Sequence, residues 1–328
     1  MRPADPVDAP GPGSPPPLTI ALGIITCGRP HGLERLLRAV AALDVTGLDV
    51  DVRVVVVDND AVGAQGRAVA ERLRPGLPFP LVVDVEAERG IPLARNRVVE
   101  LAGDVEVLGW LDDDEAPRPD WLRRLVDELR LTGADVVIGP SVPHLPVGSP
   151  AWMADGGFFE RTRFPTGTKL PGHHVRTCGV LVRRAAMPPR PRPFDESLRH
   201  TGGSDRELFV EMERSGAVML WVDEAVMVED VPASRARLRW VLRRAYRIGT
   251  SRSTTLVRDG ASARRRARRA LGGVRKIAEG VAAVAGAGLH RSGAVAAVQG
   301  LRECWYGGGL VAGAVGLRYQ EYRHLHGT

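Results

Sequence analysis

The chain has 328 residues, and 44% of them are hydrophobic, so it can fill the core of one large domain or two modest ones. Its three cysteines, Cys27, Cys178 and Cys304, lie far apart, which indicates neither a disulfide framework nor a zinc module and favours a reducing cytoplasm. The formal net charge of +6 has two unequal parts: residues 1–231 carry −9, whereas residues 232–328 carry 19 Arg and Lys against four acids, or +15. This division indicates an acidic catalytic or metal-binding body and a tail that prefers anionic surfaces.

Residues 1–17 are predicted to form a disordered leader, because the stretch is too rich in proline to pack or to serve as a signal peptide. After it, apolar runs alternate with stretches whose apolar residues recur at helical spacing. Strands are expected at residues 18–26, 52–57, 81–87, 105–111 and 134–139, with helices between them. This alternation predicts an α/β fold with a doubly wound, mostly parallel sheet.

Three of these strands end in polar turns, which begin with CGRP at Cys27, DND at Asp58 and DDDE at Asp112. Ligands of such sheets bind beyond the carboxyl ends of the strands, so the three turns are expected to converge on one crevice. Residues two apart on an extended backbone point the same way, so Asp112 and Asp114 can present two carboxylates together. That spacing suits Mg²⁺ or Mn²⁺ with phosphate and water as further ligands. The alternative is a solvated acidic turn.

Beyond the fifth strand the alternation weakens. Residues 141–176 are rich in proline, glycine and aromatic residues and have little periodicity, which is typical of a loop region that contacts substrate. A strand is expected within residues 175–184, and a short helix within residues 202–216, capped by Ser204. One or two further strands are expected within residues 217–230.

The basic tail begins with a predicted amphipathic helix at residues 235–249, whose apolar face contains Leu238, Val241, Leu242 and Ala245. The rest alternates arginine clusters with segments rich in Ala, Gly and Val. Its apolar run of about 13 residues is shorter than the roughly 20 needed to span a bilayer. The sequence therefore predicts a helical extension that lies on an anionic membrane surface, with a solvated helical cap as the alternative.

Six motifs occur in unbroken order between residues 18 and 250: GIITCGRPHGLERLL, VVVVDND, ERGIPLARN, LGWLDDDEAPRPDWL, FDESLRHTGGSD and VMVEDVPASRARLRWVLRRAYRIG. In this combination the chain resembles family 2 glycosyltransferases, which have the GT-A fold, and most closely their bacterial exopolysaccharide-type branch. The resemblance implies a nucleotide-sugar-binding half at residues 18–140, an acceptor-binding half at residues 141–233 and a basic amphipathic helical tail at residues 234–328.

The resemblance also implies which residues bind the donor. These are Thr26, Arg29, Asp58, Arg95, Asn96, Asp112 and Asp113. In the family, the acid that matches Asp58 hydrogen-bonds the nucleobase, and Arg95 lies beside the phosphates, which its planar fork suits. Asp114 matches the metal-contacting acid, and Asp112 a nearby ribose or metal contact. From the residues alone, Asp58 could equally form a turn and Arg95 could equally be a solvated helix residue.

Transfer of a sugar to a hydroxyl group needs a base opposite the departing diphosphate. Asp205 is the candidate, because it follows two glycines and opens a helix whose N-terminus favours the ionised form. Its GGSD element resembles the GGED element that carries the base of the family, and an ordinary helix-opening Asp is the alternative. Ser204 replaces a frequent Glu of the family, and Gly179 a frequent Asn, which leaves the substrate open. Candidate supporting residues are Glu229, Arg235 and Trp240.

The expected activity is therefore that of an inverting, metal-dependent glycosyltransferase. It would move a sugar from a nucleoside-diphosphate sugar, in the first instance a UDP-sugar, to a glycan, lipid-linked or small-molecule acceptor at the cytoplasmic face of the plasma membrane. A first alternative is a nucleotidyltransferase that acts on a sugar phosphate, although TCGRPHG is a poor phosphate loop. A second is a basic nucleic-acid-binding protein, although arginines without interleaved aromatic residues bind nucleic acid without specificity.

Overall fold

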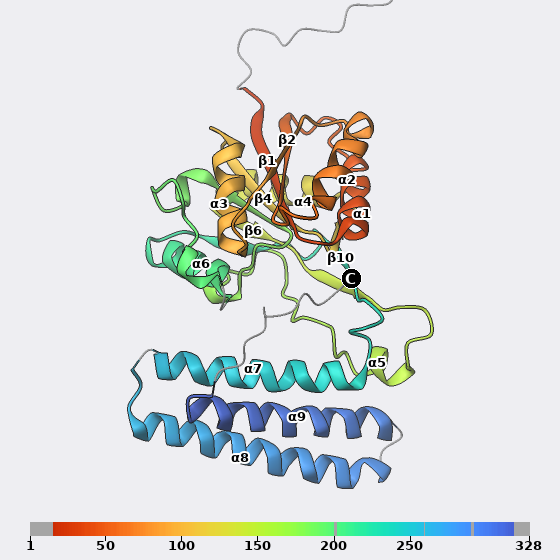
Figure 1. Cartoon of the computed structure of the whole chain (residues 1–328), viewed down its shortest axis with the longest axis vertical. Coiled ribbons are helices and arrows are strands. Elements are labelled where there is room, and N and C mark those ends of the chain that lie inside the picture. Colours follow the sequence, from red (N-terminus) through yellow and green to blue (C-terminus); the bar gives the residue numbers. More distant parts are fainter. Residues whose placement is uncertain (1–15, 200–201, 259, 290–291, 318–328) are drawn as a thin grey trace, which may run out of the picture.

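The computed structural model describes residues 16–199, 202–258, 260–289 and 292–317. Most of the leader expected at residues 1–17 lies outside these ranges. The described part consists of an α/β domain and a layer of three long helices beside it (Figure 1).

The elements are as follows. The larger sheet contains β1 (Leu18–Thr26), β2 (Val50–Asp58), β3 (Leu81–Val85), β4 (Val107–Asp112), β6 (Val136–Ile138), β8 (Val180–Arg183) and β9 (Met219–Trp221). A smaller sheet contains β5 (Glu115–Pro117), β7 (Ser141–His144) and β10 (Met227–Asp230). The helices of the domain are α1 (Pro30–Ala41), α2 (Gln65–Leu73), α3 (Ile91–Ala102), α4 (Trp121–Thr132), α5 (Ala151–Asp155) and α6 (Ser204–Arg214). The three long helices are α7 (Leu238–Arg258), α8 (Ala263–Gly286) and α9 (Gly293–Ala314).

The larger sheet has the strand order β3-β2-β1-β4-β8-β6-β9, in which β8 runs antiparallel to both of its neighbours. The other described pairs in it are parallel. Apolar residues of α1, α2 and α4 cover one face and those of α3 and α6 cover the other. Because both faces are buried, β2 consists largely of valine. The doubly wound, mostly parallel sheet expected from the sequence is confirmed.

Two local expectations were wrong. The residue that precedes α6 is Gly203, whose φ of 93° lies in the left-handed region that glycine tolerates, and it takes the N-cap position expected for Ser204. Ser204 instead becomes the first helical residue, and its side chain is buried. The helix expected at residues 235–249 begins three residues later and extends to Arg258. Arg235, which precedes the helix, contacts Asp114 of the α/β domain.

The helices α7, α8 and α9 form a bundle that packs through glycines. A Cβ atom on Gly280 in α8 would collide with the carbonyl oxygen of Gly300 in α9, and one on Gly249 in α7 would collide with that of Tyr306 in α9. The backbones therefore approach too closely for larger side chains at these positions. Glycine contacts bury little apolar surface, so the bundle is held by close backbone packing rather than by a thick core.

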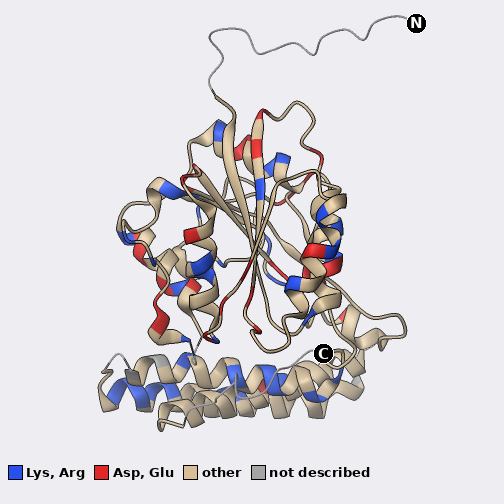
Figure 2. Cartoon of the chain, turned by 45° about the horizontal axis from the view of Figure 1, so that its top comes forward, with Lys and Arg blue, Asp and Glu red and all other residues tan. Residues whose placement is uncertain are grey.

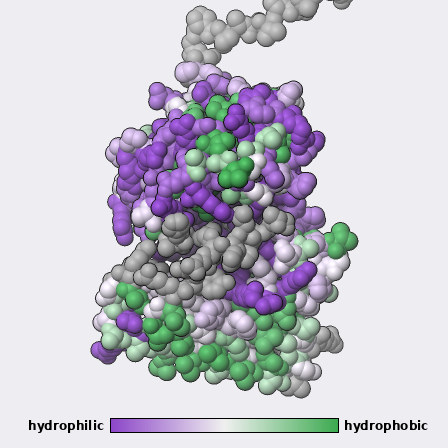
Figure 3. Space-filling model, in the orientation of Figure 1, coloured by the Kyte–Doolittle hydropathy of each residue, from purple (hydrophilic) through white to green (hydrophobic). Residues whose placement is uncertain are grey.

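Apolar side chains of the bundle consequently remain exposed. On α8, Leu271 is 69% and Val281 58% accessible, and on α9, Trp305 is 43% accessible. Figure 3 shows hydrophobic surface over the bundle and a largely hydrophilic surface over the α/β domain. In the described residues, no helix combines the length and apolar character needed to cross a bilayer.

The bundle lies across the end of the sheet at which the parallel strands finish. β1 begins far from the bundle and runs toward it (Figure 1). A small apolar cluster joins the two parts, in which Phe158 and Phe159 pack with Val241 of α7 and Val298 of α9. The bundle carries many Lys and Arg positions and few acidic ones (Figure 2). The polar strand ends therefore face a predominantly basic layer.

Candidate active site

The polar turns after β1, β2 and β4 are joined by hydrogen bonds. The backbone N–H of Asn59 donates to the carbonyl oxygen of Thr26 at 2.8 Å. The side-chain amide of Asn59 donates to the carbonyl oxygens of Glu86 at 3.1 Å and Glu88 at 2.8 Å, and its Oδ1 accepts from the backbone N–H of Gly90 at 2.7 Å. Asn59 thus connects β1, the end of β3 and the start of α3. Its only signal in the sequence was the DND pattern.

Asp58 is fully buried at the end of β2. Its Oδ1 accepts a hydrogen bond from the backbone N–H of Asp60 at 3.1 Å, and its Oδ2 accepts one from that of Arg67 at 2.9 Å. Burial raises the pKa of the Asp58 carboxyl above its usual value, and these backbone hydrogen bonds oppose the rise. Asp58 therefore organises the turn between β2 and α2 as well as being the candidate nucleobase contact.

Thr26 and Arg29 from the turn after β1 both contact Asp113. The Thr26 hydroxyl donates to Asp113 Oδ2 at 2.8 Å, and Arg29 Nη1 lies 2.9 Å from Asp113 Oδ1. Burial raises the pKa of Asp113, while Arg29 and the Thr26 hydrogen bond lower it. Asp113 is thus turned into the protein, with only 8% of its side chain accessible. These three candidate donor contacts bind each other and fix the acidic turn.

Asp114 contacts arginines from two distant parts of the chain. Arg29 Nη1 lies 3.3 Å from its Oδ2, and Arg235 Nη1 lies 3.5 Å from the same oxygen. The Arg235 guanidinium also lies over the ring of Trp240, with its Cζ 5.9 Å from the centroid. Trp240 stacks on Phe159 at 5.3 Å, within the cluster that joins the bundle to the domain. Of these two supporting candidates, Arg235 therefore reaches the acidic turn and Trp240 belongs to the junction.

Arg95 and Asn96 in α3 have different surroundings. Arg95 Nη2 lies 4.0 Å from Asp112 Oδ1, so the arginine expected beside the phosphates does border the acidic cluster. Asn96 is fully buried, and its amide donates to the Phe194 carbonyl and to Glu196 Oε1, both at 2.9 Å. Its Oδ1 accepts from the Phe194 N–H at 2.9 Å. Asn96 thus positions the segment before α6, and its expected role as a donor contact stays a prediction.

A buried ionic network lies behind the acidic turn. Glu115 in β5 and Glu229 in β10 are register partners, and Arg161 lies 3.7 Å from Glu115 Oε1 and 2.6 Å from Glu229 Oε2. Ser141 donates to Glu115 Oε1 at 2.8 Å. Burial raises the pKa of Glu115 to about 7, and Arg161 opposes the rise. Glu229 is therefore held by Arg161, which the aperiodic region at residues 141–176 gave no means of predicting.

Asp112 and Asp114 are the carboxylates best placed to bind a divalent cation, with side chains 37% and 26% accessible. In the ranges that the structure describes, no three His, Cys, Asp or Glu side chains are grouped as a complete metal site. A cation bound by two protein carboxylates completes its coordination with phosphate oxygens and water, as Mg²⁺ usually does. The residues present therefore fit a cation that is held jointly with a diphosphate.

Asp205 lies in the first turn of α6 and is half-buried. The segment before it contacts the turn between β3 and α3, because Arg199 forms an ion pair with Glu88 and a Cβ atom on Gly90 would lie 2.9 Å from Arg199 Cβ. Within the described residues, no hydrogen bond or ion pair connects Asp205 to the acids at residues 112–114. The role of Asp205 as base stays a prediction.

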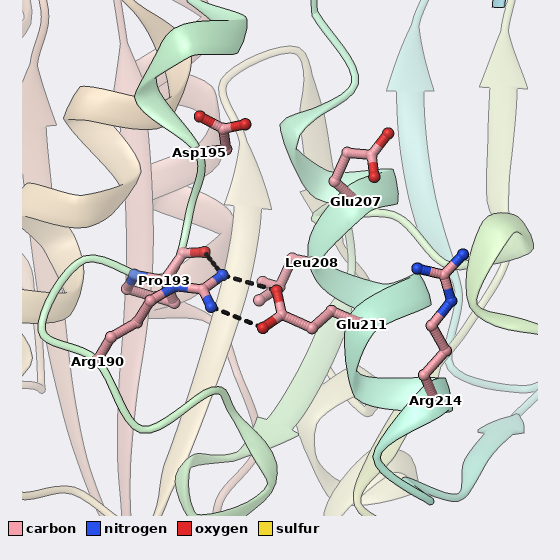
Figure 4. A pocket seen from close by; sticks show the side chains of 7 residues that line it. All are labelled: Arg190, Pro193, Asp195, Glu207, Leu208, Glu211 and Arg214. Atoms are coloured by element: carbon pink, nitrogen blue, oxygen red, sulfur yellow. Dashed lines mark hydrogen bonds and ion pairs between the residues drawn. The ribbon is translucent and has the colours of Figure 1, made fainter. Parts of the chain in front are cut away.

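The other side of α6 carries a shallow cavity of about 420 Å³. Figure 4 shows that Arg190 points toward Glu211, and the two form an ion pair with contacts of 2.6 and 2.7 Å. Glu207 and Asp195 also line this cavity, but no candidate site residue does. It is separate from the candidate site residues at the strand ends.

Comparisons with known proteins give the family. The model of the family "Glycosyl transferase family 2" matches residues 22–187. The "Succinoglycan biosynthesis protein ExoM" of Rhizobium meliloti (strain 1021) is 37% identical over 240 residues, which is 73% of this chain and 75% of that protein.

Two solved structures show the fold. S. aureus TarS has a TM-score of 0.51 and 17% identity, and the match covers 69% of this chain but only 39% of that chain. Mannosyltransferase PcManGT from Pyrobaculum calidifontis, in complex with GDP-Man and Mn²⁺, has a TM-score of 0.50 and 22% identity over 79% of this chain and 69% of that one. The family match sets aside the nucleotidyltransferase and nucleic-acid-binding alternatives. The chain belongs to glycosyltransferase family 2, has the GT-A fold and is a glycosyltransferase.

Proposed function

We propose that this glycosyltransferase moves a sugar from a nucleoside-diphosphate sugar, in the first instance a UDP-sugar, to a hydroxyl group during exopolysaccharide assembly. The observation that carries the proposal is the hydrogen-bonded convergence of the turns after β1, β2 and β4 around the acids at residues 112–114. The printed name of the relative, succinoglycan biosynthesis protein, supports the pathway class, and TarS solved with UDP supports the nucleotide. The acceptor would be a glycan, a lipid-linked sugar or a small molecule.

The donor would lie along the strand ends, with its base near Asp58 and its diphosphate between Arg95 and the acidic turn. Mg²⁺ or Mn²⁺ would be held by Asp112 and Asp114, and it would offset the charge that develops on the departing diphosphate. The complex of PcManGT with GDP-Man and Mn²⁺ supports this choice. Arg95 is preorganised for phosphate oxygens, because its guanidinium also lies 5.6 Å from the ring of Phe194.

Asp205 is proposed as the general base of a single displacement that inverts the anomeric carbon. Asp205 lies in the first turn of α6, and a carboxylate is a group that can accept the proton of the acceptor hydroxyl. Asn96 supports the placement of Asp205, because it ties the segment that leads to α6 to the helix that carries Arg95.

The bundle is proposed to rest on the inner face of the plasma membrane. Leu271, Val274 and Val281 of α8 are more than half exposed, and the arginines of residues 264–269 precede them on the same helix. Exposed apolar side chains enter the headgroup boundary, and each basic residue near an anionic surface contributes about 1 kcal/mol. Peripheral attachment needs no spanning helix.

Incubation with a panel of nucleotide-sugars and Mn²⁺, followed by measurement of released nucleoside diphosphate, tests the reaction. Asp205→Asn is expected to lower kcat at least about 100-fold, while the Kd of the nucleoside diphosphate changes less than about twofold. Glu207→Gln, in the same turn of α6 but on the cavity of Figure 4, is the matched control and should keep wild-type turnover. Wild-type kcat in the Asp205 variant would refute the base, and pyrophosphate release from a nucleoside triphosphate would refute the reaction class.

A further inference from the structure

Arg244 of α7 is a half-buried cation at the junction of the bundle and the α/β domain. In the described part of the chain, no carboxylate lies within ion-pair distance of its guanidinium group. Glu229 is the acid that acts on it electrostatically, and Glu229 is already paired with Arg161 at 2.6 Å. A partly desolvated charge without a counter-ion is unfavourable, so this position calls for an anion.

The charges around Arg244 are mostly positive. The pKa of Arg244 is lowered to about 10, chiefly by burial and in smaller part by the charges of Arg161, Arg247 and Arg176, while Glu229 opposes the shift. Arg244 nevertheless stays charged at neutral pH. The positive charges of guanidinium groups from three parts of the chain therefore act on Arg244, which raises the local affinity for a multiply charged anion.

The Arg244 side chain is held in a fixed position. Its Cζ lies 5.3 Å from the centroid of the Trp240 ring, and that ring stacks on Phe159 at 5.3 Å with an interplanar angle of 11°. Arg235 lies over the same ring and reaches Asp114 at 3.5 Å. Arg244 is thus separated from the acidic turn by one indole ring and one arginine. The contact with Trp240 preorganises its planar fork on the side of the bundle that faces the acidic turn.

We propose that Arg244, in the positive field of Arg176 and Arg247, binds a phosphate group carried by the acceptor. Guanidinium forks match phosphate oxygens bidentately, and a phosphate can engage more than one fork at once. The proposed donor contacts lie within residues 26–114, whereas Arg176 lies in the acceptor half and Arg244 in the helix that follows that half, which is why the ligand is assigned to the acceptor. This inference rests on the proposed transfer reaction, and it names the chemical class of the acceptor.

The test uses the full-length protein with its donor site filled by UDP and Mg²⁺, titrated at constant ionic strength with inorganic phosphate and separately with geranyl phosphate. Tryptophan fluorescence can follow binding, because Trp240 adjoins the site. Arg244→Gln is expected to weaken phosphate binding at least about tenfold, as loss of a hydrogen-bonding charged group usually does. Arg243→Gln, an exposed neighbour on the same helix, is the matched control and should change the Kd less than about twofold. Arg244→Lys keeps the charge without the fork and is expected to fall between the two.

The UDP titration of the same variants separates this inference from the proposed function. A wild-type Kd for UDP together with weakened phosphate binding in Arg244→Gln supports an acceptor site. An equal loss of UDP and phosphate affinity would assign Arg244 to the donor diphosphate and overturn the inference, and so would phosphate binding that is the same in all variants. Geranyl phosphate that binds more tightly than inorganic phosphate supports a lipid-linked acceptor, and equal affinities support a water-soluble one. Failure of the wild type to bind UDP would instead count against the proposed function.

Discussion

Replacement of Asp58 by Asn tests whether the turn after β2 depends on a buried carboxylate. Both oxygens of Asp58 accept backbone N–H groups, from Asp60 at 3.1 Å and Arg67 at 2.9 Å. An asparagine side chain has one acceptor oxygen, so in either orientation its amide group would face one of these N–H donors. The variant therefore loses one hydrogen bond to a charged acceptor. It also places the side-chain amide donor of the asparagine against a backbone N–H donor.

The size of the effect follows from these contacts. A hydrogen bond to a charged group contributes about 1.5–3 kcal/mol, and an unsatisfied buried donor costs about 1–3 kcal/mol. Burial already disfavours the ionised form of Asp58, as its raised pKa indicates, so neutralisation offsets part of that loss. The free energy of unfolding is expected to fall by about 2 kcal/mol and the Tm by about 5 °C. Urea unfolding followed by circular dichroism measures the first quantity.

Asp60→Asn is the control for this experiment, because Asp60 Oδ1 accepts only an exposed hydrogen bond from Gly63 at 3.2 Å. Its loss of stability should stay below about 1 kcal/mol. An Asp58 variant as stable as the wild type would refute the reasoning about the turn. UDP affinity, measured on the folded variant, tests ligand binding separately. UDP binding that is at least about tenfold weaker supports the nucleobase contact. Unchanged UDP binding would show that Asp58 stabilises the turn without contacting the nucleotide.

Gly280→Ala is expected to lower the free energy of unfolding by about 1–3 kcal/mol, because the added Cβ atom meets the backbone of α9. Gly272→Ala, on the open side of the same helix, should raise the free energy of unfolding by about 1 kcal/mol. Thermal unfolding compares the two variants. Leu271→Asn combined with Val281→Asn should lower flotation with anionic vesicles without loss of Tm, because both side chains are exposed; unchanged flotation contradicts the membrane proposal. Arg235→Gln should strengthen binding of Mn²⁺ alone by up to about fivefold, since it removes a cation from the acidic turn; titration by electron paramagnetic resonance measures it.

The main strands of the larger sheet could be predicted from the sequence, because burial on both faces of a strand leaves a continuous apolar run. The run at residues 18–26 coincides with β1, and the valines of residues 52–57 lie within β2. The position of the polar turns at the strand ends followed from the same pattern. The pairing of Thr26 with Asp113 did not, because the two residues are 87 positions apart and either could have faced solvent.

The structure of the bundle could be predicted only in part from the sequence. Its helical character was expected, but its packing depends on which glycines face a neighbouring helix. Gly273 and Gly280 are seven residues apart, as are Gly300 and Gly307, so each pair lies on one side of its helix. The seven-residue spacing of these glycines could have indicated helix packing, but the composition of the segments indicated only a weakly apolar surface helix. Arg244 gave no signal, since its surroundings come from three separate regions.

The arginines around the acidic turn explain how consecutive acids are tolerated, and they bear on the order of ligand binding. Arg29 and Arg235 both lie against Asp114, so this carboxylate is balanced by cations before any metal binds. A divalent cation alone must compete with these two guanidinium groups, whereas a diphosphate offers them phosphate oxygens in exchange for the carboxylate. Under the proposed function, donor and cation must then raise each other's affinity by the same factor. Arg235 belongs to the segment that leads into α7. The exchange of its carboxylate partner for phosphate oxygens would therefore couple donor binding to the position of the bundle.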